Sequence, residues 1–182
     1  MNISIKIIIS RFLLAFFFLL GMINSFSQEI YEHQYLVKLG DEAPDFSIPL
    51  NDGRLFQLSQ YKGQVVMLQF TASWCSVCRK EMPYIETEIW QELKDKGLVL
   101  VGVDYKEKQS VVNKFATDMK ISYPLAIDST GSVFHLFAAE GAGVTRNVII
   151  DKTGRIIYLT RLFDKKEFDE MKSVIFREVE SN

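Results

Sequence analysis

Two cysteines, Cys75 and Cys78, are the only thiols in the 182-residue chain, and they lie in the segment FTASWCSVCRKEMP. A pair with this spacing could be a redox-active dithiol, half of a metal site or a structural disulfide. A disulfide framework built for stability uses more pairs, which close longer loops. The cysteine count therefore favours reversible thiol–disulfide chemistry.

Metal binding is the first alternative. A structural zinc site needs about four ligands and a catalytic one about three from the protein. Beyond the two thiols, the candidate ligands are His33 and His135, which have no ligand spacing with each other. We therefore expect no metal and no bound cofactor.

The surrounding pattern predicts where the cysteines lie. Val65–Phe70 is short, almost entirely apolar and β-rich, which is typical of a strand buried on both faces. After it, apolar residues recur every three or four positions and predict an amphipathic helix that ends at Gly97. The residues of this apolar stripe are Cys78, Met82, Ile85, Ile89 and Leu93. The CxxC motif thus falls where a central strand meets a helix, at the sheet edge that carries the chemistry of open α/β proteins.

A second strand and helix follow. Leu98–Asp104 is another buried β-rich run, and Ser110 is expected to begin the next helix. Its apolar residues are Val111, Val112, Phe115 and Met119.

The last third of the chain predicts a hairpin. Tyr123–Ile127 indicates a short strand, and Ser132–Ala138 one or two helical turns. Val144–Ile150 and Ile156–Thr160 are β-rich and are joined by a short turn with a glycine, which indicates an antiparallel pair.

The order of elements predicts the fold class. Asp164 and Glu167 have capping-box spacing and begin a final helix. Before the core, Phe46–Ile48 and Arg54–Leu58 are short extended pieces around a turn. Strand, helix, strand, helix, hairpin and helix together predict an α/β fold with a mixed sheet, helices on both faces and an N-terminal edge-strand extension.

The predicted position of the motif assigns roles to its residues. Cys75 falls just before the helix, where unpaired N–H groups and the helix dipole favour a thiolate. It is therefore the expected nucleophile, and Cys78, about one turn later, would resolve the mixed disulfide. Ser76 and Val77 would tune the leaving group, and Trp74 would form an apolar rim.

The segment WCSVCRKEMP resembles the active site of thioredoxin-like proteins, most closely the exported TlpA/ResA group of thiol–disulfide oxidoreductases. The similarity rests on Trp74, on the CxxC after a buried strand and on the basic-x-Glu-x-Pro run Arg79–Pro83. It extends from the GDEAPDF opening, shared with AhpC/TSA relatives, to the last helix. The resemblance implies a thioredoxin-like fold and an enzyme that reduces disulfide-bonded substrate proteins and is itself reduced by an upstream thiol donor.

Two positions depart from the family pattern. Gln69 stands where thioredoxins keep a buried acid, so another group must relay the proton, and Glu81 is a candidate for that relay. Thr145 stands where the family usually has a cis-proline. Because a non-proline cis bond costs about 2.5–4 kcal/mol, we predict that the Val144–Thr145 bond is trans, with both residues in the substrate groove opposite Cys75.

Two other functions compete with this interpretation. A thiol peroxidase is the nearest enzyme, but peroxiredoxins place a proline and a hydroxyl residue where this chain has Leu68 and Ala72. They also place an arginine where Thr145 stands; Arg146, one residue on, points to the opposite face of the strand and is expected at the surface or in a salt bridge. The non-enzymatic alternative is a binding module with an inert cysteine pair.

Residues 1–27 are typical of a secretory signal peptide. Lys6 and Arg11 precede the uncharged run Phe12–Ile23, which is shorter than the about 20 residues of a membrane span. We expect export to the periplasm, with an uncleaved anchor over residues 7–26 as the alternative and as the sole contact with a membrane. Residues 28–38 would be a lead-in and 39–182 one thioredoxin-like domain. The net charge of −2 and scattered basic residues indicate no nucleic-acid partner.

Overall fold

The computed structural model describes residues 34–181, and the compact unit that contains both cysteines begins at Leu36. The signal peptide or anchor predicted within residues 1–27 lies outside the described residues, as does His33. Within residues 34–181, no helix has both the length and the apolar character needed to cross a membrane.

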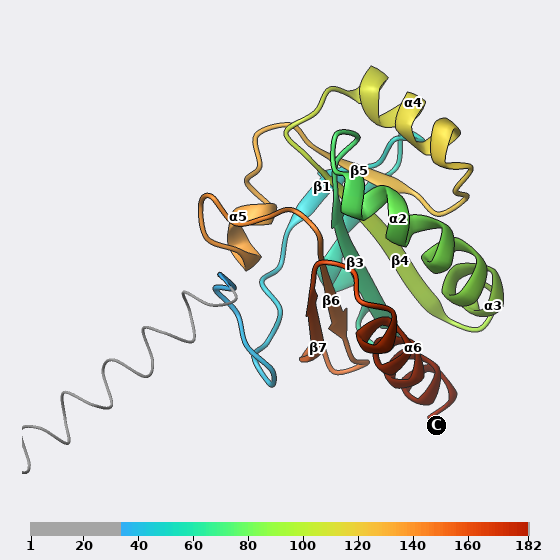
Figure 1. Ribbon diagram of the computed structural model, residues 1–182. Coiled ribbons are helices and arrows are strands. Elements are labelled where there is room, and N and C mark those ends of the chain that lie inside the picture. Colours follow the sequence, from blue (N-terminus) through green and yellow to red (C-terminus); the bar gives the residue numbers. More distant parts are fainter. Residues whose placement is uncertain (1–33, 182) are drawn as a thin grey trace, which may run out of the picture. The chain divides into compact units, whose positions relative to one another are not determined.

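A five-stranded mixed sheet forms the centre of this unit, with the strand order β5-β4-β3-β6-β7 (Figure 1). Its strands are β3 (Val65–Thr71), β4 (Leu98–Tyr105), β5 (Leu125–Asp128), β6 (Arg146–Ile150) and β7 (Ile156–Arg161). β3, β4 and β5 are parallel, whereas β6 is antiparallel to both β3 and β7. The predicted parallel core and antiparallel hairpin are both confirmed.

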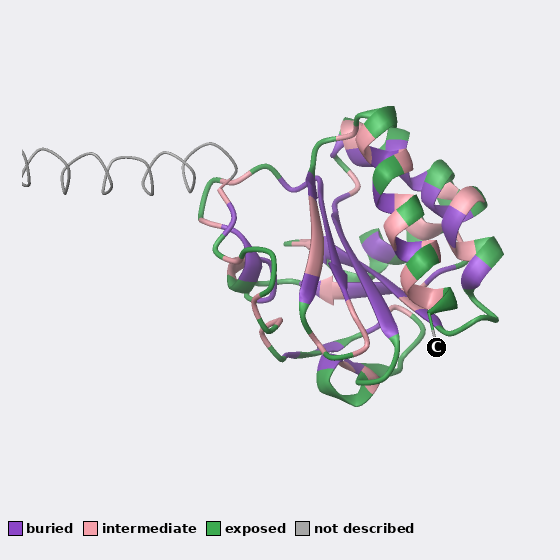
Figure 2. Cartoon of the chain, turned by 90° about the horizontal axis from the view of Figure 1, so that it is seen from below, coloured by how far each residue is buried: buried purple, intermediate pink, exposed green. Residues whose placement is uncertain are grey.

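The central strands of the sheet are almost entirely buried, whereas the edge strand β7 is mostly half-buried (Figure 2). All seven residues of β3 and all five of β6 are buried, which fits the largely apolar sequence of β3, whereas β6 begins with the buried polar residues Arg146 and Asn147. β3 and β4 pair from Val65 with Leu98 to Thr71 with Asp104, so their carboxyl ends reach the same edge. The CxxC motif leaves the sheet at this edge.

One face of the sheet is covered by α2 (Ser76–Ile85), α4 (Gln109–Met119) and α6 (Lys165–Glu180) (Figure 1). α2 continues through a π-helical stretch, η2 (Glu86–Trp90), into α3 (Gln91–Leu93). The predicted apolar stripe is fully buried, from Cys78 to Leu93. Pro83 lies inside α2 without ending it. The helix ends at Leu93, earlier than predicted, and Gly97 forms part of the following turn with a φ of 97°.

The beginning of α4 was predicted incorrectly. The helix starts at Gln109, and its N-cap is Lys108, which makes no side-chain cap hydrogen bond. Ser110 therefore does not begin it. Val111 is 38% exposed and does not share the buried face of Val112 and Phe115. In contrast, Asp164 caps α6 as predicted, because its carboxylate accepts the N–H groups of Lys166 and Glu167 at 3.0 Å.

The other face of the sheet is covered by α5 (Phe134–Phe137) and a separate hairpin of β1 (Ser47–Pro49) and β2 (Leu55–Gln57). Phe70 of β3 packs its ring against Phe134 and Phe137, and Phe137 also contacts Phe46 beside β1. Helices thus lie on both faces, and the predicted edge-strand extension is the β1–β2 hairpin.

Candidate active site

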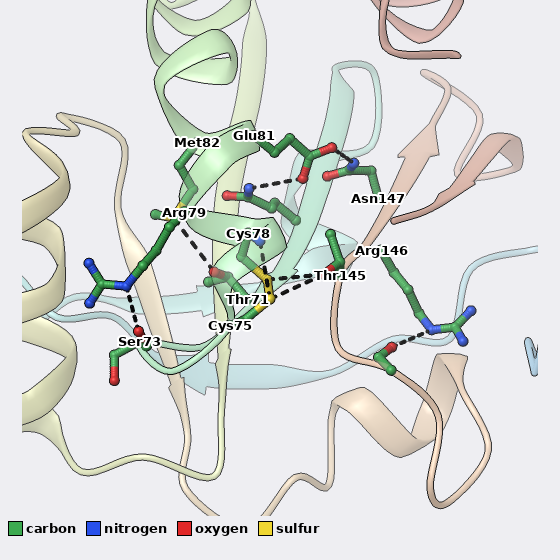
Figure 3. Close-up of a disulfide and its surroundings, with 12 residues drawn as sticks. Thr71, Ser73, Cys75, Cys78, Arg79, Glu81, Met82, Thr145, Arg146 and Asn147 are labelled. Carbon is green, nitrogen blue, oxygen red and sulfur yellow. Dashed lines mark hydrogen bonds between the residues drawn. A yellow bond between two sulfur atoms is a disulfide. The ribbon is translucent and has the colours of Figure 1, made fainter. Parts of the chain in front are cut away.

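Cys75 and Cys78 form a disulfide at the start of α2 (Figure 3). Cys75 is the N-cap of the helix, and its Sγ accepts the backbone N–H of Cys78 at 3.1 Å. Cys75 is 6% exposed, whereas Cys78 is completely buried. The two cysteines are therefore not equivalent: Cys75, the less completely buried one, also lies at the positive end of the helix dipole.

Ser73 fixes the turn that leads to Cys75. Its backbone N–H and its hydroxyl both donate to the carboxylate of Glu107, each at 2.6 Å. Its carbonyl accepts the Nε–H of Arg79 at 2.7 Å. Glu107 follows β4 and Arg79 belongs to α2, so this turn is held from two sides.

Thr145 lies directly against the disulfide, as Figure 3 shows. Its Oγ1 is 3.1 Å from the Sγ of Cys75 and 3.3 Å from that of Cys78. No peptide bond among the described residues is cis, so the Val144–Thr145 bond is trans, as the sequence predicts. Both Val144 and Thr145 are buried. A hydroxyl thus faces the sulfurs where a proline ring is usual in the family.

The remaining residues of the motif lie at its surface. Trp74 is 64% exposed, Ser76 is exposed and Val77 is half-buried. The rim predicted for Trp74 and the tuning predicted for Ser76 and Val77 are compatible with these positions.

A buried polar cluster lies behind the disulfide. Glu81 is one turn after Cys78 on α2, and its carboxylate accepts hydrogen bonds from Asn147 at 2.7 Å and from Gln69 at 3.4 Å (Figure 3). Tyr123 in turn donates to the Oε1 of Gln69 at 2.8 Å. Burial raises the pKa of Glu81 to about 7, although the two amide hydrogen bonds oppose this shift. A carboxyl group that can gain or lose a proton near neutral pH therefore lies three residues after Cys78 on α2.

Asn147 belongs to this cluster but was not predicted from the sequence. Its side chain bridges Glu81 of α2 and Thr160 of β7, and it stands opposite Gln69 in the β3–β6 pairing. The available signal was weak, because Asn147 is the last of three consecutive polar residues, Thr145 to Asn147, in the β-rich run Val144–Ile150.

A second buried acid, Asp104, was also not predicted as part of the site. It is the residue before the last of β4 and pairs with Thr71 of β3. It is fully buried, and neither carboxylate oxygen has a hydrogen-bond partner among the described residues. Burial, and then the nearby charge of Glu107, raises the pKa of Asp104 to about 8. Asp104 is therefore mainly protonated at neutral pH.

Arg146 points to the opposite face of β6 from the disulfide, as the strand pattern predicted, but it does not lie at the surface. It was expected at the surface or in a salt bridge, but it is completely buried, because β6 is an interior strand with both faces covered. Its Nε–H donates to the carbonyl of Gly143 at 3.0 Å, and Figure 3 shows the side chain directed away from the disulfide. Leu68 and Ala72 are buried and lack the groups expected of a peroxidase. The sulfurs thus face a threonine and no arginine from this strand.

Metal ligands do not converge in the described part of the chain. No group of three or more histidine, cysteine or acidic residues is placed to hold a metal ion within residues 34–181. His135 contacts the hydroxyl of Tyr105 at 3.4 Å.

Comparison with known proteins agrees with this geometry. Residues 39–159 match the model of the AhpC/TSA family. The chain is 30% identical over 130 residues to the thiol-disulfide oxidoreductase ResA of Bacillus cereus, covering 71% of this chain and 73% of that relative. It is 32% identical over 120 residues to ResA of Geobacillus thermodenitrificans, covering 66% and 67%.

Solved structures give the same result. A protein from Bacteroides thetaiotaomicron described as a candidate protein disulfide isomerase superposes with a TM-score of 0.79 at 46% identity, covering 81% of this chain and 94% of that one. A candidate thiol:disulfide interchange protein DsbE from Chlorobium tepidum gives 0.70 at 28% identity, covering 79% and 99%.

Proposed function

The chain belongs to the AhpC/TSA family and is a thiol–disulfide oxidoreductase of thioredoxin-like fold, and from this premise we propose that it is exported and reduces the disulfides of substrate proteins. Cys75 is the nucleophile and Cys78 the resolving cysteine. Trp74, Ser76, Val77, Val144 and Thr145 form the substrate groove.

The observation that carries this assignment is the difference between the two sulfurs. Cys75 is the N-cap, retains 6% exposure and accepts an N–H hydrogen bond, whereas Cys78 is completely buried. N–H donors and the helix dipole stabilise a thiolate. An incoming disulfide therefore meets the sulfur that is better stabilised as an anion.

The reaction is a two-electron exchange. The Cys75 thiolate attacks one sulfur of the substrate disulfide, forming a mixed disulfide and releasing the other substrate sulfur, which takes up a proton. Cys78 loses its proton and attacks the Sγ of Cys75, which releases the second substrate thiol. The substrate gains two electrons and two protons, and the enzyme is left with the Cys75–Cys78 disulfide. An upstream thiol donor reduces this disulfide again.

Glu81 is the group that receives the proton of Cys78. Gln69 cannot titrate, but it hydrogen-bonds the carboxylate of Glu81 together with Asn147. With its pKa raised to about 7 by burial, Glu81 accepts a proton at neutral pH and returns it readily.

Two features support the reducing direction and the export. The motif and its flanks resemble the exported TlpA/ResA group, and the first residues have the pattern of a signal peptide. A single cysteine pair in an exported chain also indicates a redox-active dithiol. Because the compartment is oxidising, a dedicated thiol donor must keep that dithiol reduced.

Trapping the mixed disulfide tests the proposal. In Cys78→Ser, Cys75 should form a stable mixed disulfide with a disulfide-bonded protein such as insulin, and Cys75→Ser should form none. The Cys75–Cys78 couple of the wild type, equilibrated with glutathione buffers, should have a reduction potential of about −270 mV, which is typical of reductants, and not of about −120 mV, which is typical of oxidants. Rapid reduction of hydrogen peroxide by the dithiol, with Cys75 trapped as sulfenic acid, would instead favour the peroxidase.

A further inference from the structure

Gln69 faces the buried carboxylate of Glu81 with the nitrogen of its amide. Its Nε2 donates to the Oε2 of Glu81 at 3.4 Å, and Asn147 donates to the other carboxylate oxygen at 2.7 Å. All three side chains are buried. An amide has a donor end and an acceptor end, which exchange places when the group makes a half-turn. The end that faces Glu81 therefore matters for its protonation.

The donor end favours the ionised form of Glu81, because N–H groups hydrogen-bond a carboxylate. If the carbonyl of Gln69 faced Glu81 instead, it would accept a hydrogen bond from the protonated carboxyl group and favour the neutral form. Burial raises the pKa of Glu81, the amides of Asn147 and Gln69 oppose this, and the negative charge of Glu167 on α6 raises it further. Among the described residues, these amides are thus the groups that stabilise the anion.

The hydroxyl of Tyr123 fixes the orientation of the Gln69 amide. It donates to the Oε1 of Gln69 at 2.8 Å and has no other hydrogen-bond partner in the described part of the chain. Burial, and then the charges of Glu81 and Glu86, raises the pKa of Tyr123 well above its usual value, so the hydroxyl remains a donor. A half-turn of the amide would leave this buried O–H group without an acceptor, which costs free energy.

The strand between Tyr123 and Gln69 leaves room for their hydrogen bond. β4 lies between β3 and β5, and its Gly102 pairs with Gln69 on one side and with Leu125 on the other. A Cβ atom at Gly102 would lie 3.4 Å from the ring of Tyr123 and 2.4 Å from the side chain of Leu125. A glycine inside a strand marks such a close approach. Tyr123 can therefore reach across β4 to Gln69.

We propose that Tyr123 and Gln69 are positioning residues for the step in which Cys78 resolves the mixed disulfide. Tyr123 holds the N–H groups of the Gln69 amide toward Glu81, which favours the ionised carboxylate, the form that accepts the proton of Cys78. The fold alone would be served by phenylalanine, which fills the same space without a buried hydroxyl. The proposal rests on the proposed function, because it needs Glu81 as the acceptor of that proton.

Titration of Glu81 in the oxidised protein tests the proposal without turnover, because neither cysteine ionises in the disulfide. The carbon-13 shift of the Glu81 carboxyl group, assigned with Glu81→Gln, should have its midpoint at a pH of about 7 in the wild type. Tyr123→Phe keeps the ring but frees the amide, so the midpoint should rise by about 0.5–1 pH unit, as expected for one hydrogen bond. Tyr158→Phe is the matched control: it removes a hydroxyl that donates to Glu170 and should leave the midpoint unchanged.

A double variant tests whether Tyr123 acts through Gln69. Gln69→Leu removes the donor and should also raise the midpoint of Glu81. Adding Tyr123→Phe to it should cause no further rise, because no amide is left to orient. Tyr123→Phe preserves the packing of the ring, so its midpoint decides the proposal even if Gln69→Leu fails to fold.

The resolving step should show the same dependence. With insulin as substrate and quenched-flow trapping, Tyr123→Phe should resolve the mixed disulfide about two- to fivefold more slowly at pH 7, in proportion to the smaller ionised fraction of Glu81. At pH 9, where Glu81 is ionised in both proteins, the rates should agree. A merely structural role of Tyr123 would lower stability without moving either pH dependence.

The outcomes separate this proposal from the proposed function. An unchanged Glu81 midpoint in Tyr123→Phe, or a further rise when Tyr123→Phe is added to Gln69→Leu, overturns the positioning role and leaves thiol–disulfide exchange standing. A shifted midpoint with unchanged resolution at pH 7 also overturns that role. A wild-type protein that does not reduce insulin refutes the proposed function itself, whatever the titration gives.

Discussion

Replacing Asp104 with asparagine should stabilise the oxidised protein at neutral pH. Burial raises the pKa of Asp104 from 3.8 to about 8, so the carboxyl group is protonated in the folded chain at pH 7 and ionised in the unfolded chain. Because the unfolded state then binds fewer protons, stability falls as pH rises from about 4 to about 8. Asparagine has nearly the same shape and removes this titration.

The size of the effect follows from the two pKa values. Between the unfolded pKa of 3.8 and pH 7, this titration lowers the free energy of unfolding by about 4 kcal/mol at most, because each pH unit contributes about 1.36 kcal/mol. The buried amide of asparagine also lacks a partner, which costs about 1–3 kcal/mol. The net gain for Asp104→Asn at pH 7 should therefore be about 1–3 kcal/mol.

Urea unfolding of the oxidised protein at several pH values between 4 and 8.5 measures this directly. The free energy of unfolding of Asp104→Asn should be equal to or lower than that of the wild type at pH 4, and higher than that of the wild type above pH 6. Asp128→Asn is the matched control, because Asp128 is also buried but its carboxylate accepts hydrogen bonds from Phe134 and Ser132. That variant should be destabilised. A pH profile for Asp104→Asn that runs parallel to the wild-type profile would refute the reasoning.

Further predictions concern the site itself. Glu81→Gln should slow resolution of the mixed disulfide about 10- to 100-fold at pH 7 by removing the proton acceptor, which quenched-flow trapping of the intermediate would reveal; unchanged resolution would exclude the relay. Thr145→Val should slow alkylation of reduced Cys75 severalfold at neutral pH, because the hydroxyl can donate a hydrogen bond to the thiolate. Equal alkylation rates of variant and wild type across pH 5–9 would show that the hydroxyl does not stabilise the thiolate. Glu107→Gln and Glu86→Gln should each lower the free energy of unfolding by about 1 kcal/mol, since both carboxylates hold a serine N–H and hydroxyl. Only the Glu107 variant should alter the reactivity of Cys75, and equal reactivity in the two variants would contradict a role for Ser73 in fixing the turn.

The helices and strands that have a regular pattern of apolar residues could be predicted from the sequence. The apolar stripe from Cys78 to Leu93 and the continuous apolar run of β3 required only periodicity, and both are buried as expected. The exact first residue of a helix was harder to predict. Serine is a common cap residue, which favoured Ser110, but α4 begins after Lys108, whose side chain makes no cap hydrogen bond.

The buried polar groups could not be predicted in the same way. Glu81 could be named from the sequence as a candidate for the relay, but its hydrogen bond with Asn147, which is 66 residues away in the sequence, could be seen only in the fold. The face that Arg146 takes was predicted correctly from strand alternation, but its burial was not, because alternation does not tell that both faces of β6 are covered.

The short separation of the two cysteines has a consequence for repeated turnover. The disulfide joins residues only three apart, so it restricts the unfolded chain by about 2 kcal/mol, against about 4.7 kcal/mol for a 100-residue loop. Opening the bond therefore removes less than half of the stabilisation that a disulfide closing a 100-residue loop provides. The core between the sheet and α2, α4 and α6 does not depend on the bond, so we expect the fold to persist in both redox forms.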